Sequence, residues 1–337
     1  MTDTPHATLF FPFEIGQIAP PDKGTRALFL GAEPGFRLPE GFGAELTVAQ
    51  ASRPHFLALK KAGFAVEPTA TGDGYDLALV ALGRHRGEGE NRIAEAFARL
   101  RPEGVLVAAG AKNEGADGFR RRMAAILPLD GSLSKHHGVA FWLRRREILP
   151  EELFPQPRSR DGELAELATA PGMFSRDRVD PGSRLLVENL PRDLGGAIAD
   201  FGAGWGFLSL EMLKRPAITG IDLYEADWAS LEAARANIAA QGGEGRTRFF
   251  WRDLLSEPVE RAYDAVVMNP PFHRGRAAEP AIGAGFIRAA ARALKPRGRL
   301  FLVANRGLPY EATLQEMFSE SRELTRDAAY KILAARK

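Results

Sequence analysis

An internal repeat is the feature of this sequence that most constrains its fold. Each half of the chain contains a strand-like apolar run, a loop, a helical pattern, a turn and a second strand-like run. The corresponding ranges are 75–80 and 263–268 for the first strand, about 93–100 and 282–294 for the helix, 101–104 and 295–298 for the turn, and 105–107 and 299–303 for the second strand. Strands that alternate with helices are typical of an α/β fold with a mainly parallel sheet. Duplication of one such fold is the simplest explanation.

The length of the chain agrees with two domains. A chain of 337 residues, 45% of them apolar, is long enough to bury two hydrophobic cores. Glycine-containing loops correspond in the two halves, at 31–36 and 202–207, and a proline-rich, charged stretch begins at Pro150. We therefore predict one domain over residues 1–149, a linker over 150–164 and a second domain over 165–337.

The composition excludes several classes of protein. The chain has no cysteine, so disulfides, thiolate metal sites and cysteine nucleophiles are excluded, and a reducing, cytoplasmic location is expected. No metal site is predicted. The apolar run at 9–13 is interrupted by Pro12 and follows no basic segment, and no stretch approaches the length of a transmembrane helix. Neither secretion nor membrane insertion is expected.

The run Ile198–Phe207 predicts a buried strand that turns through glycines into a helix. Such glycines permit the required dihedral angles and let a ligand approach the backbone, while an aspartate at the strand end can pair with a cofactor amine. The dinucleotide fingerprint places its last glycine one position later, so S-adenosylmethionine is favoured over a nicotinamide cofactor. The cofactor-binding residues predicted here are Asp200, Gly202, Gly204 and Gly206. A purely structural turn is the alternative.

Carboxylates follow at the ends of the next two predicted strands. In the strand 218–225, Glu225 is the preferred ligand for the ribose hydroxyls and Asp222 is the reserve. The run 249–254 reads as the third strand, and Asp253 within it is predicted to accept the adenine amino group. Alternatively, Asp253 caps the following turn.

The loop that follows the strand 263–268 is predicted to be catalytic. An exocyclic amine of a base is a poor nucleophile, because its lone pair is delocalised into the ring, so hydrogen-bond acceptors must reorient it. The Asn269 side-chain oxygen and the Pro270 carbonyl can accept the two amine hydrogens, Pro271 helps to restrict the loop, and Phe272 can stack on the extruded base. Asn269 is expected to border the cofactor as well. The alternative is a strand-terminating turn with Phe272 in the core.

Positive charge is concentrated between Gly118 and Arg146, although the net charge of the chain is only +2. The segment holds one acid, Asp130, and predicts a surface that faces phosphates; an ordinary solvated face is the alternative. The candidate RNA-binding residues are Arg120, Arg121, Arg122, Arg144, Arg145 and Arg146, together with His273 and Arg274 beside the catalytic loop.

The residues from Asp200 to Gly206, with Glu225, Asp253 and the loop 269–272, resemble the small-subunit rRNA guanine-N2 methyltransferases of the RsmC-like group. The segments 172–183 and 303–310 are similar as well. The resemblance implies two tandem Rossmann-like class I methyltransferase domains, each with a mainly parallel seven-stranded sheet. It also implies S-adenosylmethionine as cofactor and methylation of the N2 amine of a guanine in 16S ribosomal RNA.

The N-terminal copy departs from the pattern that the chemistry needs. Phe29, Glu33 and Pro34 stand where the C-terminal copy has Asp200, Gly204 and Trp205, and the segment 81–84 replaces Asn-Pro-Pro-Phe. We expect this copy to be non-catalytic and to bind RNA or support the active half. Trp205 itself stands where a smaller residue is common in the family.

Two other functions remain open from the sequence. Asn-Pro-Pro-aromatic loops also serve enzymes that methylate glutamine amides of proteins, and related loops act on adenine or cytosine in DNA. A non-catalytic RNA-binding assembly factor with the same fold is the third possibility. Because the duplication supplies two domains within one chain, a monomer is expected.

Overall fold

The computed structural model describes residues 5–146, 166–169, 172–175, 177–271, 273–274 and 277–337. It divides the chain into two compact units, Met1–Arg158 and Ser159–Lys337. The predicted linker over 150–164 lies outside the described residues, and so does Phe272. Each unit is described by itself.

The N-terminal unit alternates helices and strands. Its helices are α1 (Pro5–Glu14), α2 (Arg53–Lys61), α3 (Arg86–Arg99) and α4 (Ala116–Ile126). Its strands are β1 (Arg26–Leu30), β2 (Glu45–Ala49), β3 (Ala65–Glu67), β4 (Tyr75–Ala81), β5 (Leu100–Ala111), β6 (Gly131–Lys135) and β7 (Gly138–Arg144). They form one sheet in the order β3-β2-β1-β4-β5-β7-β6.

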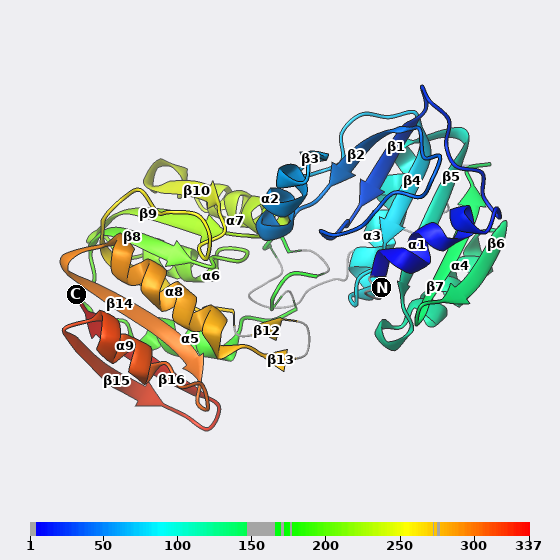
Figure 1. Ribbon diagram of the computed structural model, residues 1–337. Helices are drawn as coiled ribbons and strands as arrows, with labels where there is room; N and C mark the ends of the chain where they lie inside the picture. Colours follow the sequence, from blue (N-terminus) through cyan, green and yellow to red (C-terminus); the bar gives the residue numbers. More distant parts are fainter. Residues whose placement is uncertain (1–4, 147–165, 170–171, 176, 272, 275–276) are drawn as a thin grey trace. The chain divides into compact units, whose positions relative to one another are not determined.

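The C-terminal unit repeats this arrangement (Figure 1). Its helices are α5 (Pro181–Asn189), α6 (Phe207–Leu213), α7 (Trp228–Ala240), α8 (Pro280–Ala293) and α9 (Glu311–Met317). Its large sheet contains β8 (Gly196–Phe201), β9 (Ile218–Glu225), β10 (Thr247–Trp251), β11 (Tyr263–Met268), β14 (Leu294–Asn305), β15 (Glu320–Arg326) and β16 (Tyr330–Arg336). A separate pair is formed by β12 (His273–Arg274) and β13 (Ala277–Ala278), of which only the backbone is described.

The two sheets have the same topology. The C-terminal order is β10-β9-β8-β11-β14-β16-β15, which matches the N-terminal order strand by strand. In each sheet the first five strands are parallel to one another, the sixth is antiparallel to the fifth, and the seventh is antiparallel to the sixth. The register matches as well, since Phe29 pairs with Leu79 where Asp200 pairs with Val267. The predicted duplication and the mainly parallel seven-stranded sheets are confirmed.

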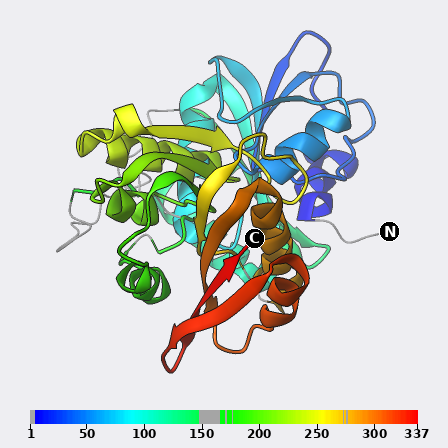
Figure 2. The same ribbon diagram turned by 90° about the vertical axis from the view of Figure 1, so that its left-hand side faces the viewer.

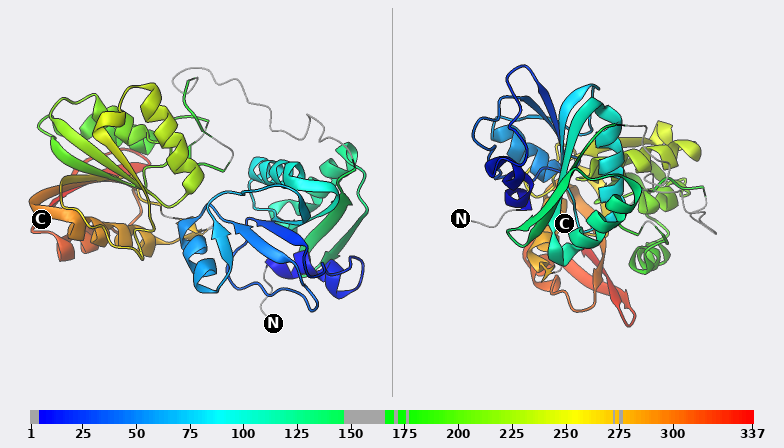
Figure 3. Two further views of the ribbon diagram at one scale, coloured as in Figure 1. Left: turned by 90° about the horizontal axis from the view of Figure 1, so that it is seen from above. Right: turned by 90° about the vertical axis from the view of Figure 1, so that its right-hand side faces the viewer.

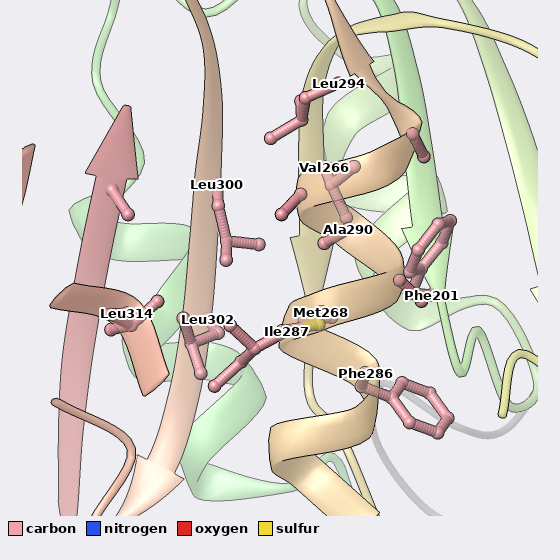
Figure 4. Packing of buried hydrophobic residues seen from close by; sticks show 14 of the residues in the cluster. Phe201, Val266, Met268, Phe286, Ile287, Ala290, Leu294, Leu300, Leu302 and Leu314 are labelled. Carbon is pink, nitrogen blue, oxygen red and sulfur yellow. The ribbon is translucent and has the colours of Figure 1, made fainter. Parts of the chain in front are cut away.

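Each sheet is covered by helices, as Figure 2 and Figure 3 show from other sides. In the C-terminal unit, α5, α6 and α7 pack on one face, and α8 and α9 pack on the other. The strand β11 is an almost unbroken apolar run because both of its faces are buried. Figure 4 shows the second face, where Ile287 and Ala290 of α8 lie against Met268 and Leu302. This packing fixes the strand ends from which the functional loops emerge.

Three predicted boundaries were wrong. The helix α3 begins at Arg86 rather than near 93, and β10 ends at Trp251, so that Asp253 follows the strand instead of ending it. The predicted turns at 101–104 and 295–298 lie within β5 and β14. One residue in each, Glu103 and Arg297, adopts a positive φ at a register shift, and pairing then resumes.

Candidate active site

The loop between β8 and α6 holds three glycines in the left-handed region. Their φ angles are 74° at Gly202, 55° at Gly204 and 95° at Gly206, where other residues are strained. A Cβ added at Gly204 would meet no atom within 4 Å, whereas one at Gly206 would lie 3.2 Å from the Ala234 Cβ of α7. The loop therefore rests on α7 at one end and leaves its backbone open to a ligand in the middle.

Asp200, near the carboxyl end of β8, is fully buried. Ser209 Oγ donates to Asp200 Oδ2 at 2.7 Å, while Oδ1 has no hydrogen-bond partner within the described part of the chain. Burial, together with the negative charge of Glu225, raises the pKa of Asp200 to about 7. A buried carboxylate oxygen without a partner is unfavourable, so this position fits a cationic ligand group.

Glu225 is the last residue of β9, and its carboxylate faces the glycine loop. The Gly204 N–H donates to Oε2 at 2.8 Å, and the N–H groups of Ala226 and Asp227 donate to Oε1 at 2.8 and 2.9 Å. Burial raises the pKa of Glu225 above its ordinary value. The structure thus brings the predicted ribose ligand directly to the predicted cofactor loop.

Asp222, the reserve ligand, points to the other face of β9, because side chains three positions apart on a strand face opposite ways. Arg248 donates to its two carboxylate oxygens from Nε at 2.8 Å and from Nη2 at 2.6 Å. The Tyr263 hydroxyl also donates to Asp222, at 2.6 Å. The buried Asp222 carboxylate is occupied by the half-exposed Arg248, so the structure does not bring Asp222 to the cofactor loop.

Asp253 caps the turn that follows β10. Its Oδ1 accepts from the Leu255 N–H at 3.0 Å, and its Oδ2 accepts from Ser256 Oγ at 2.6 Å. This is the capping arrangement that the sequence left open as the alternative. A carboxylate oxygen has a second lone pair, so the cap is compatible with the predicted contact to adenine.

The side chain of Asn269 is held by the beginning of α5. Its Nδ2 donates to Asp180 Oδ2 at 3.0 Å and to Ser183 Oγ at 2.8 Å. Asp180 is also the N-cap of α5, accepting from the Ser183 N–H at 2.7 Å. Both hydrogens of the amide nitrogen are therefore used, which leaves the amide oxygen as the acceptor that Asn269 presents.

The contacts from Asp180 and Ser183 were not predicted from the sequence. The Asp-Pro-Gly-Ser run signals a helix start, with aspartate at the N-cap and proline at the first helical position. It does not show that the cap reaches an asparagine 89 residues further along the chain.

A small pocket of about 100 Å³ lies beside Asn269. It lies between the ends of β11 and β14, and its walls include Phe174, Asp180, Pro270, Asn305, Tyr310 and Tyr330. The ring of Phe174 is 60% exposed, an unusual state for a large apolar side chain. The sequence did not single out Phe174 as a site residue.

The predicted phosphate-facing arginines have acidic partners from outside their segment. Arg120 and Arg121 share Asp117, at 3.1 and 3.3 Å, and Arg122 pairs with Glu90 at 2.9 Å. The positive charge is therefore lower than the segment alone suggests. A role of these arginines in RNA binding stays a prediction.

The remaining predicted RNA contacts are dispersed. Arg146 pairs with Asp130, and Arg145 donates to the backbone carbonyls of Ala98 and Leu100. Arg144 is exposed at the end of β7. His273 and Arg274 lie in β12, and their side chains lie outside the described residues.

In the N-terminal unit, aromatic rings gather where the C-terminal unit has its cofactor loop. Phe29 contacts Phe36 with ring centroids 5.2 Å apart and His6 at 5.3 Å, and Phe36 stacks on Phe64 at 4.6 Å. His6 also reaches the counterpart of Gly204, since the Glu33 N–H donates to its Nε2 at 2.9 Å. Burial lowers the pKa of His6 to about 4. This aromatic cluster surrounds Phe29 and Glu33, the counterparts of Asp200 and Gly204.

The described ranges lack a metal-binding cluster and a membrane-spanning helix. They contain no group of three or more His, Asp or Glu side chains arranged to hold a metal ion. They also contain no helix that is both long and apolar enough to cross a bilayer.

Residues 165–334 match the family described as methyltransferase small domain. An Escherichia coli protein named ribosomal RNA small subunit methyltransferase C is 31% identical over 239 residues, which cover 70% of this chain and 68% of that protein. The chain belongs to the ribosomal RNA small subunit methyltransferase C family. A second member, from Hahella chejuensis, is 35% identical over 173 residues, which cover 51% of this chain and 50% of that protein. The resemblance predicted from the sequence is confirmed.

A solved structure of this family resembles the whole chain. It is the T. thermophilus 16S rRNA N2 G1207 methyltransferase in complex with AdoMet and guanosine. The TM-score is 0.78 at 28% identity, and the match covers 99% of this chain and 91% of that one. The match extends over both units, so the tandem architecture is shared with that member of the family.

Proposed function

We propose that this chain transfers a methyl group from S-adenosylmethionine to the N2 amine of a guanine in small-subunit ribosomal RNA. The observation that carries the proposal is the fixed amide of Asn269 beside a glycine loop flanked by Asp200 and Glu225. The family supports it, since its T. thermophilus member is an N2 methyltransferase of 16S rRNA solved with AdoMet and guanosine.

The residues around the glycine loop fit S-adenosylmethionine, which supplies an electrophilic methyl group on a positively charged sulfur. The unpartnered Oδ1 of Asp200 suits the ammonium group of the methionine end. Glu225 suits the ribose hydroxyls, and Asp253 suits the adenine amino group. Gly204, with open space where a side chain would be, lets the cofactor approach the backbone.

Asn269 and Pro270 then act on the amine to be methylated. The Asn269 oxygen and the Pro270 carbonyl accept the two N2 hydrogens, which turns the nitrogen lone pair out of conjugation with the ring. Asp180 and Ser183 are positioning residues, because they hold the Asn269 amide in the orientation that this step requires. A strong general base is not required if the proton leaves after the methyl group has been transferred.

Phe174 supports a flat substrate. An exposed ring on the wall of the Asn269 pocket provides a stacking surface for an extruded base. A glutamine amide is planar as well but much smaller than a nucleobase, so the large exposed ring favours a nucleobase over a protein substrate. The complete hydrogen-bonding arrangement around Asn269 disfavours a non-catalytic assembly factor.

We assign a supporting, non-catalytic role to the predicted domain over residues 1–149, because aromatic side chains surround its counterparts of Asp200 and Gly204. The proposed catalytic domain covers 165–337. The proposed enzyme is a monomer that needs no metal. It works in the cytoplasm, where ribosomal RNA is found.

The test is to incubate the protein with methyl-labelled cofactor and separated small and large subunits from undermodified ribosomes, and then to map the labelled nucleotide. Label on N2 of a guanine in small-subunit rRNA is the expected result. Label in large-subunit rRNA would overturn the assignment of the substrate, and label in protein alone would favour the glutamine function. Cofactor binding without any labelled product would favour the assembly factor.

A further inference from the structure

The N-terminal unit contains a pocket of about 500 Å³ at the carboxyl ends of β4 and β5. These strands correspond to β11 and β14, so both pockets lie at equivalent strand ends, although the other walls of this one come from α3 and α4. Its walls include Leu82, Gly83, Arg86, Gly110, Phe119 and Arg122. The N-terminal unit therefore has an open pocket at this edge of its sheet.

Two arginines line this pocket and share one acid. The Nε of Arg86 and the Nε of Arg122 both contact the same oxygen of Glu90, each at 2.9 Å. The Glu90 side chain is only 10% exposed, whereas those of Arg86 and Arg122 are 65% and 43% exposed. Both contacts use Nε, which leaves the terminal nitrogens of both guanidinium groups for a ligand. Glu114 also lines the pocket, so the two arginines balance two acids, and it is the terminal guanidinium nitrogens that suit a phosphate.

Glycines line the rest of the opening. A Cβ added at Gly115 or at Gly118 would meet no atom within 4 Å, so the backbone at the start of α4 is exposed to the pocket. No side chain caps this helix in the described structure. Its first N–H groups therefore add hydrogen-bond donors beside the two arginines.

An apolar wall completes the pocket, and both units build it in the same way. Gly89 in α3 leaves room for the Phe119 ring, since a Cβ there would lie 3.1 Å from that ring. Gly283, at the same position of the equally long α8, leaves room for the ring of Tyr310. Leu82 lies beside Phe119 on this wall. The pocket thus combines two arginines at its mouth with an aromatic side, which together suit a nucleotide.

We propose that this pocket binds one nucleotide of the RNA strand, with the phosphate between Arg86 and Arg122 and the base against Leu82 and Phe119. The proposal rests on the proposed function, since it takes the substrate to be RNA. It makes the N-terminal unit a second nucleotide-binding module, which holds a nucleotide other than the one that is methylated.

The test compares two double variants of the full chain that remove equal charge. Arg86→Gln/Arg122→Gln removes the cations of the pocket, and glutamine can still donate to Glu90. Arg235→Gln/Arg326→Gln is the matched control, because each arginine is exposed, pairs with a glutamate three positions away and does not line the pocket. Binding of a fluorescein-labelled single-stranded RNA dodecamer is measured over a salt series.

We expect the pocket pair to weaken RNA binding about tenfold and to lower the salt slope by about 0.7, the value of one phosphate contact on a single strand. The control pair should change the dissociation constant by about twofold, as expected for exposed charges away from a contact. Equal losses from both pairs would overturn the proposal, because general charge would then explain them.

A third variant leaves both ion pairs intact. Gly118→Trp fills the opening, and we expect the same tenfold loss; binding like the wild type would overturn the proposal. Guanosine monophosphate is tested as a competitor, and a pocket that binds it while the variants keep full RNA affinity is a site for free nucleotides instead. Wild-type protein that bound no RNA would refute the proposed function itself, which separates that failure from failure of the pocket.

Discussion

The two units share a sheet order and differ in the loops at its carboxyl edge. Where β8 continues through three glycines into α6, β1 is followed by residues 31–44, which are all described and contain no helix. Asp200 is replaced by Phe29 within an aromatic cluster, and the register of β4 places Ala81 where Asn269 stands. The apolar cores preserve one topology in both units, while the residues at the strand ends differ and leave the glycine loop and the Asn-Pro-Pro loop to the C-terminal unit alone.

One position shows how small the difference can be. The register of β2 makes Gln50 the counterpart of Glu225. The Oε1 of Gln50 accepts from the N–H two residues further along the chain, as the Oε1 of Glu225 does. The Nε2 of Gln50, however, donates to the Ala32 carbonyl. The local geometry is retained, but a neutral amide replaces the carboxylate that would bind ribose.

The largest effect is expected from giving the C-terminal unit the residue that the N-terminal unit has at the position of Asn269. Asn269→Ala installs the N-terminal residue, and we expect kcat to fall by about 100- to 1,000-fold, as for loss of a hydrogen-bonding group in a transition state. The affinity for S-adenosylmethionine, measured by calorimetry, should stay within about twofold. Asn189→Ala, on α5 and outside the pocket, is the matched control. Equal activity of the Asn269 variant would end the proposed role of this amide.

The next largest effect is expected in the glycine loop. Gly204→Glu installs the residue of the N-terminal copy at a φ of 55° and places a second carboxylate beside Glu225. We expect the dissociation constant for the cofactor to rise about fiftyfold, through strain and like-charge repulsion.

A matched control separates backbone strain from loss of the site. Gly242→Glu has the same chemistry at a φ of 69°, in open space after α7. It should lower the melting temperature to a similar extent and leave cofactor affinity unchanged. A similar loss of affinity in both variants would show that strain alone is responsible.

The pH dependence of cofactor binding tests Asp200. Its raised pKa of about 7 means that the carboxylate is charged above this pH and becomes protonated below it. If the charged form binds the cofactor ammonium, affinity should fall about tenfold from pH 8 to pH 6. Asp200→Asn should bind weakly and lose most of this dependence, whereas an unchanged pH profile in the variant would place the titrating group elsewhere.

The smallest effect is expected at the exposed ring. Phe174→Ala should raise KM for RNA about fivefold, since base stacking on an aromatic side chain contributes roughly 1 kcal/mol or more, and kcat should change little. Leu255→Ala, which removes another exposed apolar side chain of the same unit, is the control. An unchanged KM for the Phe174 variant would contradict the proposed stacking of this ring on a base of the RNA.

The sequence predicts those features of the site that depend on local spacing. Strand ends, glycines and the Asn-Pro-Pro loop are read from short windows, because strand periodicity and backbone conformation are local properties. Contacts across the fold are not local. The hold of Asp180 on Asn269 joins residues far apart in the chain, and the pairing of Arg122 with Glu90 supplies an acid from another helix.

Asp222 and Glu225 show the same limit within one strand. Spacing alone allowed either carboxylate to bind ribose. Only the pairing of β9 with β10, which places Arg248 beside Asp222, shows which of the two is occupied.

The aromatic cluster of the N-terminal unit also limits the substitutions that this unit can tolerate. Replacing Phe29 with aspartate, the residue of the C-terminal copy, would remove a buried ring and bury a charge. Loss of a buried ring alone costs about 3–5 kcal/mol. The total stability of a domain is roughly 5–15 kcal/mol, so each single substitution of a ring in this cluster would threaten folding before it created any cofactor binding. The rings therefore make the N-terminal unit hard to convert into a cofactor-binding unit by single substitutions.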